Sequence, residues 1–314
     1  MPVRSSIQGR SPVGLRRGLR ELQRKIFYPV RRRWRIKIEH PAFLIVAPSF
    51  THKSAGIRAL YRLGYHLNTA GYSAAMAPMG RRIDDLPDWP VAVHDGPAED
   101  SIVIYPEVVS GNPLKAKKVV RWTLNTPGLI GGDTYYSDEE MVFVCNPMQL
   151  ATVSKSVSKP LTSSRVLSVG LIDPAYIYPD PGAEKTVDCF FTHKGAEIRA
   201  RWPLPNEANL QSIEEVTPTM ASLGEVLRRT RTLYSYDHKS TILKEAVICG
   251  CRVLVVHEDG RLLDPETCGC IENNVFWGDG FRESYVRRYR DSTFVDAFIR
   301  ELTTRWQVPR IDRY

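Results

Sequence analysis

Short apolar runs alternate with polar segments along most of the chain from residue 42 onward. Residues 42–50, AFLIVAPSF, are almost continuously apolar, which is typical of a strand buried on both faces of a parallel sheet. An apolar stripe at helical spacing comes next, made by Ile57, Leu60, Tyr61, Gly64 and Leu67. Gly71 is a suitable stop for that helix, and YSAAMAP at 72–78 has the character of a second strand. The order predicts a βαβ unit.

Further β-branched or aromatic runs follow, and they predict the remaining strands. They occupy residues 101–107, 118–125, 141–147, 165–174, 186–195, 232–237 and 252–260. Helical spacing recurs at 221–230 and at 294–306. This alternation predicts an α/β fold with two doubly wound, Rossmann-like domains that face each other across a cleft. In such sheets ligands bind at the carboxyl ends of the strands.

A polar stretch rich in Ser, Thr and Lys at 149–164 indicates a boundary between the two halves. The chain length of 314 residues is comfortable for two domains. The predicted organisation is a basic N-terminal arm (1–40), an N-terminal α/β domain (41–150), a linker (151–164), a C-terminal α/β domain (165–290) and a C-terminal helix (291–314).

Charge is concentrated in the arm. Residues 1–38 hold twelve Lys or Arg and one acid, Glu21, so their net charge is +11. The whole chain has a formal net charge of +8, so the remaining residues sum to −3. Leucine and isoleucine recur at three- and four-residue steps between these basic residues, which predicts an amphipathic helix for an anionic membrane surface. The alternative is a solvated helix packed on the body. Aromatic residues are too sparse in the arm to favour nucleic acid as a partner.

The six cysteines do not indicate a disulfide framework. The first residues lack the apolar core of a secretory signal, so a cytoplasmic protein with free thiols is expected. With the basic arm docked on a membrane, it would be peripheral at the inner face of the plasma membrane. Two Cys-Gly-Cys triplets, 249–251 and 268–270, suggest metal ligands, but structural zinc sites more often have a two-residue gap. Cys249 and Cys251 lie at an expected helix end and strand start, so they are predicted to be core residues, and no metal or other cofactor is expected.

The segment YSYDHKSTILKEAVICG, residues 234–250, places polar residues between a strand and a helix. Ser240 and Thr241 begin the expected helix, where free amides attract phosphate or accept a cap. Glu245 lies one turn further on the same face, near the offset between a diphosphate and a ribose. Spacing alone leaves phosphate binding and helix capping equally open.

Three other strand ends carry candidate chemistry. After the strand at 186–191, Thr192, Lys194 and Gly195 suit a phosphate, since lysine supplies charge and glycine permits close approach. The alternative is an ordinary turn with a solvated lysine. After the first strand, His52 is a candidate base, and Ser54 and Gly56 open a helix suited to an anion or a sugar hydroxyl.

The fourth candidate is Glu107, which ends the strand at 101–107 and is expected to face the cleft as the base toward an acceptor hydroxyl. Its alternative role is to cap the following loop. Of the two candidate bases, Glu107 is preferred to His52.

Two stretches, YPEVVSGNPLKAKKVVRWTLNTPG (105–128) and LYSYDHKSTILKEAVICGCRVLV (233–255), resemble segments of GT-B glycosyltransferases of bacterial capsule and O-antigen synthesis. The resemblance covers about 42–300 in architecture, while its specific motifs are short. It implies a metal-independent transfer from a nucleotide-sugar to a surface glycan or lipid-linked glycan. Glu245 would hold the donor ribose, and both Ser240-Thr241 and Lys194-Gly195 would contact the diphosphate.

One part of the family pattern is only formally met. Asp237 and Glu245 have the eight-residue separation of paired acids in retaining members, but no glycine-rich turn follows Asp237. The stereochemical outcome therefore stays open.

Two other functions fit the same sequence. A nucleotide-sugar epimerase can share this architecture, and epimer formation without an acceptor would identify it. A non-enzymatic membrane or RNA tether would lose all function when residues 1–38 are deleted, whereas a transferase would lose liposome flotation and keep activity on a soluble acceptor.

Overall fold

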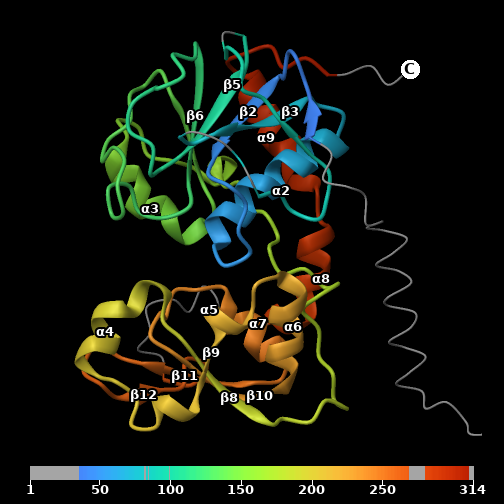
Figure 1. Cartoon of the computed structure of the whole chain (residues 1–314). Coiled ribbons are helices and arrows are strands. Elements are labelled where there is room, and N and C mark those ends of the chain that lie inside the picture. The colour runs from blue at the N-terminus through green and yellow to red at the C-terminus, as the bar shows by residue number, and fades with distance from the viewer. Residues whose placement is uncertain (1–34, 81–82, 84, 99, 269–279, 311–314) are drawn as a thin grey trace, which may run out of the picture.

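The computed structural model describes residues 35–80, 83, 85–98, 100–268 and 280–310. The predicted amphipathic arm and Cys270 lie outside the described residues, apart from the last few residues of the arm. Within these ranges the chain forms two sheets with helices packed on them (Figure 1). None of the helices in the described ranges has the length and apolar character that a membrane crossing needs.

The first sheet has seven strands, and every pair of neighbours is parallel. The strands are β1 (Arg35–Lys37), β2 (Phe43–Ala47), β3 (Ala74–Pro78), β4 (Val91–Val93), β5 (Ile102–Pro106), β6 (Lys118–Thr123) and β7 (Met141–Val144). Their spatial order is β1-β4-β3-β2-β5-β6-β7. From β4 to β7 this is the Rossmann order 3-2-1-4-5-6, whose direction reverses between β2 and β5.

Helices cover mainly one face of this sheet. The crossover helix α2 (Ala55–Thr69) and the late helix α9 (Thr293–Thr303) share a core with alternate strand residues such as Phe43. Phe298 of α9 lies against Phe143 with 4.9 Å between ring centroids. The opposite face, with Tyr105, packs largely against the loop that follows β5. Loops therefore take much of the place that a doubly wound sheet gives to helices.

The second sheet has five strands in the order β12-β11-β10-β8-β9. They are β8 (Val187–Phe191), β9 (Gln211–Ser212), β10 (Thr230–Ser235), β11 (Arg252–Val256) and β12 (Leu262–Leu263). All pairs are parallel except β11 with β12. The connections lead outward in opposite directions from β8 and β10, so this sheet has its own switch point between those two strands.

The helices of this half differ in length and position. They are α4 (Ala196–Arg201), α5 (Ile213–Val216), α6 (Met220–Arg229), α7 (Ile242–Ile248) and α8 (Phe281–Arg290). One core joins apolar residues of α5 to α8 with Cys249 and Cys251, which are buried as predicted. A smaller core on the other face includes Ile198 of α4.

The passage between the sheets differs from the predicted one. Residues 165–174 form no strand, so that prediction is wrong; the segment connects the two cores, with Leu167 in the first and Ile172 in the second. The proposed linker instead contains part of α3 (Leu150–Val153), whose Val153 packs beside β7. Apolar residues alternating with Gly and Pro allowed no distinction between a strand and a buried connection.

Candidate functional site

Three of the predicted site residues, His52, Ser240 and Glu245, lie where the two halves meet. In Figure 1 the loop between β2 and α2 faces α5 and α7 of the other half. His52, Arg58, Ser240 and Glu245 all line one crevice there. Both sheets present the carboxyl ends of their switch-point strands to this region, which is where open α/β sheets bind ligands.

The crevice is closed in this structure. Its volume of about 10 Å³ holds about one water molecule. Two hydrogen bonds cross it from the loop after β2: Lys53 Nζ donates to the Glu214 carbonyl at 2.6 Å, and His52 Nε2 lies 2.9 Å from the Thr217 carbonyl. Because a carbonyl oxygen only accepts, the His52 proton is on Nε2. A nucleotide-sized ligand therefore requires the halves to separate.

A buried ion pair also joins the halves. Arg58 Nη1 of α2 lies 2.5 Å from Glu245 Oε1 of α7, and both residues are at most 4% exposed. Glu245 is thus on the cleft side of its helix, as its spacing predicted. Its carboxylate is bound to arginine here, so binding a ribose would require that pair to open.

The polar helix starts act as caps in this closed form. Ser54 caps α2 by accepting from the Ile57 amide, and Ser240 accepts from the Ile242 amide at 3.4 Å. Thr241 is buried at the start of α7 and makes no side-chain cap. Gly56 packs 3.5 Å from Leu124, measured from the position a Cβ would take. These four predicted contacts with substrate stay predictions.

Glu107 follows β5 at the switch point of the first sheet and is 3% exposed. Its Oε2 accepts from the Leu124 amide at 2.8 Å. Burial raises the pKa of the Glu107 carboxyl, although the Leu124 amide and the charge of Lys194 oppose the shift. A raised carboxyl pKa suits a general base.

The turn after β8 already holds an anion. The amides of Thr192 and His193 both donate to Glu214 Oε2, at 3.1 and 3.2 Å. The backbone of Thr192 has the right-handed helical conformation, and that of His193 has the left-handed one, with φ of +39°. With this pair of conformations the two amides form a concave anion-binding nest. The exposed Lys194 follows directly. The turn therefore has an anion-binding conformation, and the Glu214 carboxylate occupies it.

Gly195 has a structural reason for lacking a side chain. A Cβ at Gly195 would lie 2.2 Å from the Tyr236 carbonyl oxygen, so the turns after β8 and β10 touch through their backbones. From the sequence, this glycine was predicted to allow close approach to a phosphate. The close approach observed is to the neighbouring turn.

Asp237, in the turn after β10, lies opposite His193. Its Oδ2 is 2.7 Å from His193 Nδ1, and its Oδ1 accepts from the Lys239 amide at 2.9 Å. Burial alone would raise the pKa of Asp237, but the His193 and Lys239 hydrogen bonds and the Lys194 charge hold that pKa below its ordinary value. Asp237 is therefore an ionised acceptor, and the proton of the pair is on Nδ1.

Arg58, Glu214 and His193 are the site residues that the sequence did not single out. His193 lies between Thr192 and Lys194 in a turn that the sequence did single out, and the signal for it was its position directly after a buried strand. Arg58 and Glu214 are ordinary charged residues on helices. Only the packing of the halves gives them their positions.

Acid is expected to destabilise the protein through His52. Burial lowers the pKa of His52 to about 4, with the Arg58 and Lys53 charges contributing, while an unfolded histidine titrates near 6.5. Because the unfolded state then binds the extra proton, stability falls as pH drops from 6.5 to 4, by up to about 1.4 kcal/mol per pH unit. Urea unfolding of wild type and His52→Gln across this range should give a shallower pH dependence for the variant. Equal slopes would contradict the assignment.

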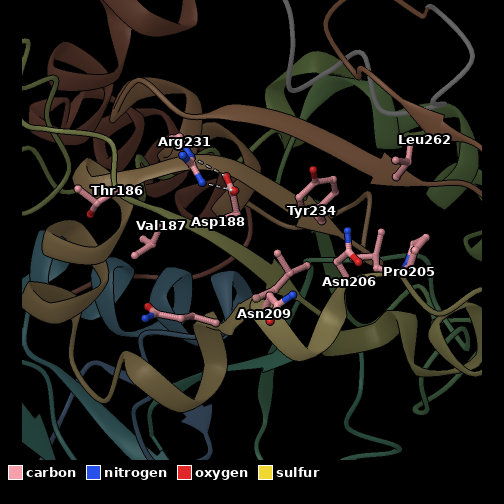
Figure 2. A pocket seen from close by; sticks show the side chains of 12 residues that line it. Thr186, Val187, Asp188, Pro205, Asn206, Asn209, Arg231, Tyr234 and Leu262 are labelled. Atoms are coloured by element: carbon pink, nitrogen blue, oxygen red, sulfur yellow. Dashed lines mark hydrogen bonds and ion pairs between the residues drawn. The ribbon is translucent and has the colours of Figure 1, made fainter.

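A larger cavity lies elsewhere, on the second sheet. It has a volume of about 440 Å³ and includes the exposed Asp188–Arg231 ion pair together with Tyr234 (Figure 2). It is lined from the start of β8 and the segment around Asn206, and no predicted site residue contributes to it. The crevice is preferred to this cavity as the candidate site because it lies at the carboxyl ends of the strands, although its volume is smaller.

No metal centre is formed among the residues that the structure describes, where no group of three or more His, Cys, Asp or Glu side chains is suitably placed. Comparison of the chain with models of known protein families and with curated proteins returned no match.

Proposed function

We propose that the protein is a glycosyltransferase that moves a sugar from a nucleotide-sugar to a surface glycan or lipid-linked glycan. The observation that carries the proposal is the anion-holding nest of Thr192 and His193 beside Lys194 at the end of β8. A diphosphate would take the place of the Glu214 carboxylate in that nest. The site is at the switch point of its sheet, where a nucleotide is expected.

The remaining roles follow from the facing edges. The donor would lie on the second sheet, with Glu245 as the ribose ligand once its pair with Arg58 has opened. The acceptor would lie near Ser54 and Gly56, with Glu107 accepting its proton. His52 is the weaker base, because burial keeps it neutral with a pKa of about 4 and its Nε2 proton is already donated to a carbonyl.

Docking of the basic N-terminal arm on an anionic membrane, as a peripheral protein at the inner face of the plasma membrane, is part of the proposal. It would bring the crevice close to a lipid-linked acceptor. Liposome flotation of the full chain against a chain lacking residues 1–38 tests it, and equal flotation would contradict it.

The donor site can be tested before the sugar is known. Thermal unfolding with a panel of nucleoside diphosphates and nucleotide-sugars should identify a ligand that raises the Tm, since binding at 100 times Kd stabilises by about 2.7 kcal/mol. Lys194→Met is expected to weaken that ligand about tenfold, or about 1.4 kcal/mol. Glu214→Ala should strengthen it, because the competing carboxylate is gone.

A matched lysine provides the control. Lys118, at the start of β6, donates to the Asp100 carbonyl at the opposite edge of the first sheet. Lys118→Met should leave the ligand's affinity unchanged. If no nucleotide raises the Tm, or if Lys118→Met and Lys194→Met act alike, the donor assignment is wrong. Epimer formation without an acceptor would favour the epimerase instead.

A further inference from the structure

His193 and Asp237 form a side-chain pair at the switch point of the second sheet. The carboxylate fixes the tautomer, because an ionised Asp237 accepts from Nδ1 and leaves Nε2 as the nitrogen that exchanges a proton. In the described part of the chain His193 Nε2 has no hydrogen-bond partner, and the side chain is 28% exposed. The ring therefore has one nitrogen held and one accessible to a ligand.

The backbone at His193 is held in an unfavourable conformation. Its φ of +39° is in the left-handed region, which few non-glycine residues adopt, although asparagine, aspartate and histidine are enriched there. The ring stacks on Phe191 at 5.5 Å, and Phe191 itself lines the crevice between the halves. A non-glycine residue held in this conformation by contacts with Asp237 and Phe191, next to the crevice, is typical of a functional position.

The charged groups around the ring define what it can meet. Asp237 lies on the β10 side, Glu214 of α5 is bound to the His193 amide, and Lys194 follows in the chain. Arg199 of α4 donates to the neighbouring Thr192 hydroxyl at 3.4 Å. His193 thus contributes its amide to the anion nest and its imidazole beside that nest. A phosphate bound in the nest would therefore lie next to the His193 ring.

Building on the proposed function, we propose that His193 is the acid that protonates the leaving diphosphate, with Asp237 as its positioning residue. The bond between the anomeric carbon and the phosphate oxygen breaks, and its electron pair stays on that oxygen, which takes the proton from His193 Nε2. The acceptor hydroxyl forms the new bond to the anomeric carbon, and its proton passes to Glu107. Asp237 stabilises the imidazolium before transfer.

Asparagine is the informative substitution at His193. It tolerates the left-handed backbone and can still donate to Asp237, but it cannot carry a transferable proton. With the nucleotide-sugar selected by thermal unfolding, His193→Asn should lower kcat about 10²- to 10³-fold with little change in KM. With a glycosyl fluoride donor, whose leaving group needs less proton transfer, the loss should be much smaller. Asp237→Asn should lower kcat by an intermediate factor.

A second histidine–aspartate pair supplies the control. His257 Nδ1 lies 3.0 Å from Asp259 in the loop after β11, and its ring is about as exposed as that of His193. His257→Asn should leave kcat within twofold. Because His193 must be protonated to act as the acid, the wild-type rate should fall at high pH. That fall should be absent in His193→Asn and present in His257→Asn. Equal losses with both donors, or an unchanged profile, would overturn the proposal.

An experiment without a sugar separates this inference from the proposed function. In an NMR pH titration of the chain labelled with ¹⁵N-histidine, inorganic pyrophosphate should move the midpoint of the His193 signal to higher pH, because an adjacent anion stabilises the imidazolium. His193→Asn identifies the signal, and the His257 signal should not move. If the His193 signal also stays unchanged, the inference fails. If it moves but no transfer is found with any donor, the phosphate contact stands and the transferase assignment fails.

Discussion

Arg58→Met is expected to lower the free energy of unfolding by about 3–5 kcal/mol, because it leaves the Glu245 carboxylate buried without its partner. The arginine and the carboxylate are 2.5 Å apart and come from opposite halves of the molecule. Removing one charge therefore weakens both the packing of α7 and the contact between the halves. Urea unfolding at neutral pH measures the loss.

The double variant Arg58→Met/Glu245→Leu should recover most of that stability, since replacing both members of a buried pair is often neutral. Arg165 and Glu301 provide a matched surface pair at 3.0 Å, with side chains 27% and 23% exposed. Arg165→Met should cost less than about 1 kcal/mol. If the double variant is as unstable as Arg58→Met alone, the buried charge is not the cause.

This pair also matters for ligand entry. Arg58 Nε is buried and has no hydrogen-bond partner among the described residues, so the arginine is not fully satisfied by Glu245 and the Leu171 carbonyl. An incompletely satisfied buried pair offsets little of its desolvation cost. Exchanging the carboxylate for a ligand is therefore less costly than the short distance suggests. Because this exchange has a low cost, the closed crevice does not prevent the protein from adopting an open form that binds a nucleotide.

The sequence predicted the parts of the fold that depend on local pattern. The apolar run around Phe43 and the helical stripe of α2 gave the first βαβ unit, and strand ends at Glu107, Thr192 and Asp237 were found as expected. The short strands β9 and β12 have only two residues each, too few for a periodic signal. Loops rather than helices cover much of the first sheet, which no local pattern could indicate.

The site was predicted as separate strand ends, and their pairing was not. Glu245 was placed on the correct face, but its partner lies 187 residues away in the chain. His193 and Asp237 are 44 residues apart, and their contact depends on β8 and β10 being neighbours. Sequence spacing gives the face of a helix or the end of a strand. Which ends meet is set by sheet order.

Gly195→Ala is expected to destabilise the second half by about 3 kcal/mol and to abolish nucleoside diphosphate binding together. The added Cβ would lie 2.2 Å from the Tyr236 carbonyl oxygen and 2.4 Å from its carbon, and these are backbone atoms that cannot rotate away. Relief requires the turns after β8 and β10 to move apart. That movement separates His193 from Asp237 and alters the nest, so stability and binding should fall together.

Gly56→Ala separates this effect from the general consequence of adding a methyl group. A Cβ at Gly56 meets Leu124 at an ordinary 3.5 Å, and alanine favours the helix by about 0.5–1 kcal/mol. Its free energy of unfolding should therefore stay the same or rise. Urea unfolding and calorimetric titration with the selected nucleoside diphosphate measure both quantities. Full binding by Gly195→Ala would mean that the diphosphate site does not depend on the contact between the two turns, and the anion site would then have to be sought elsewhere along the crevice.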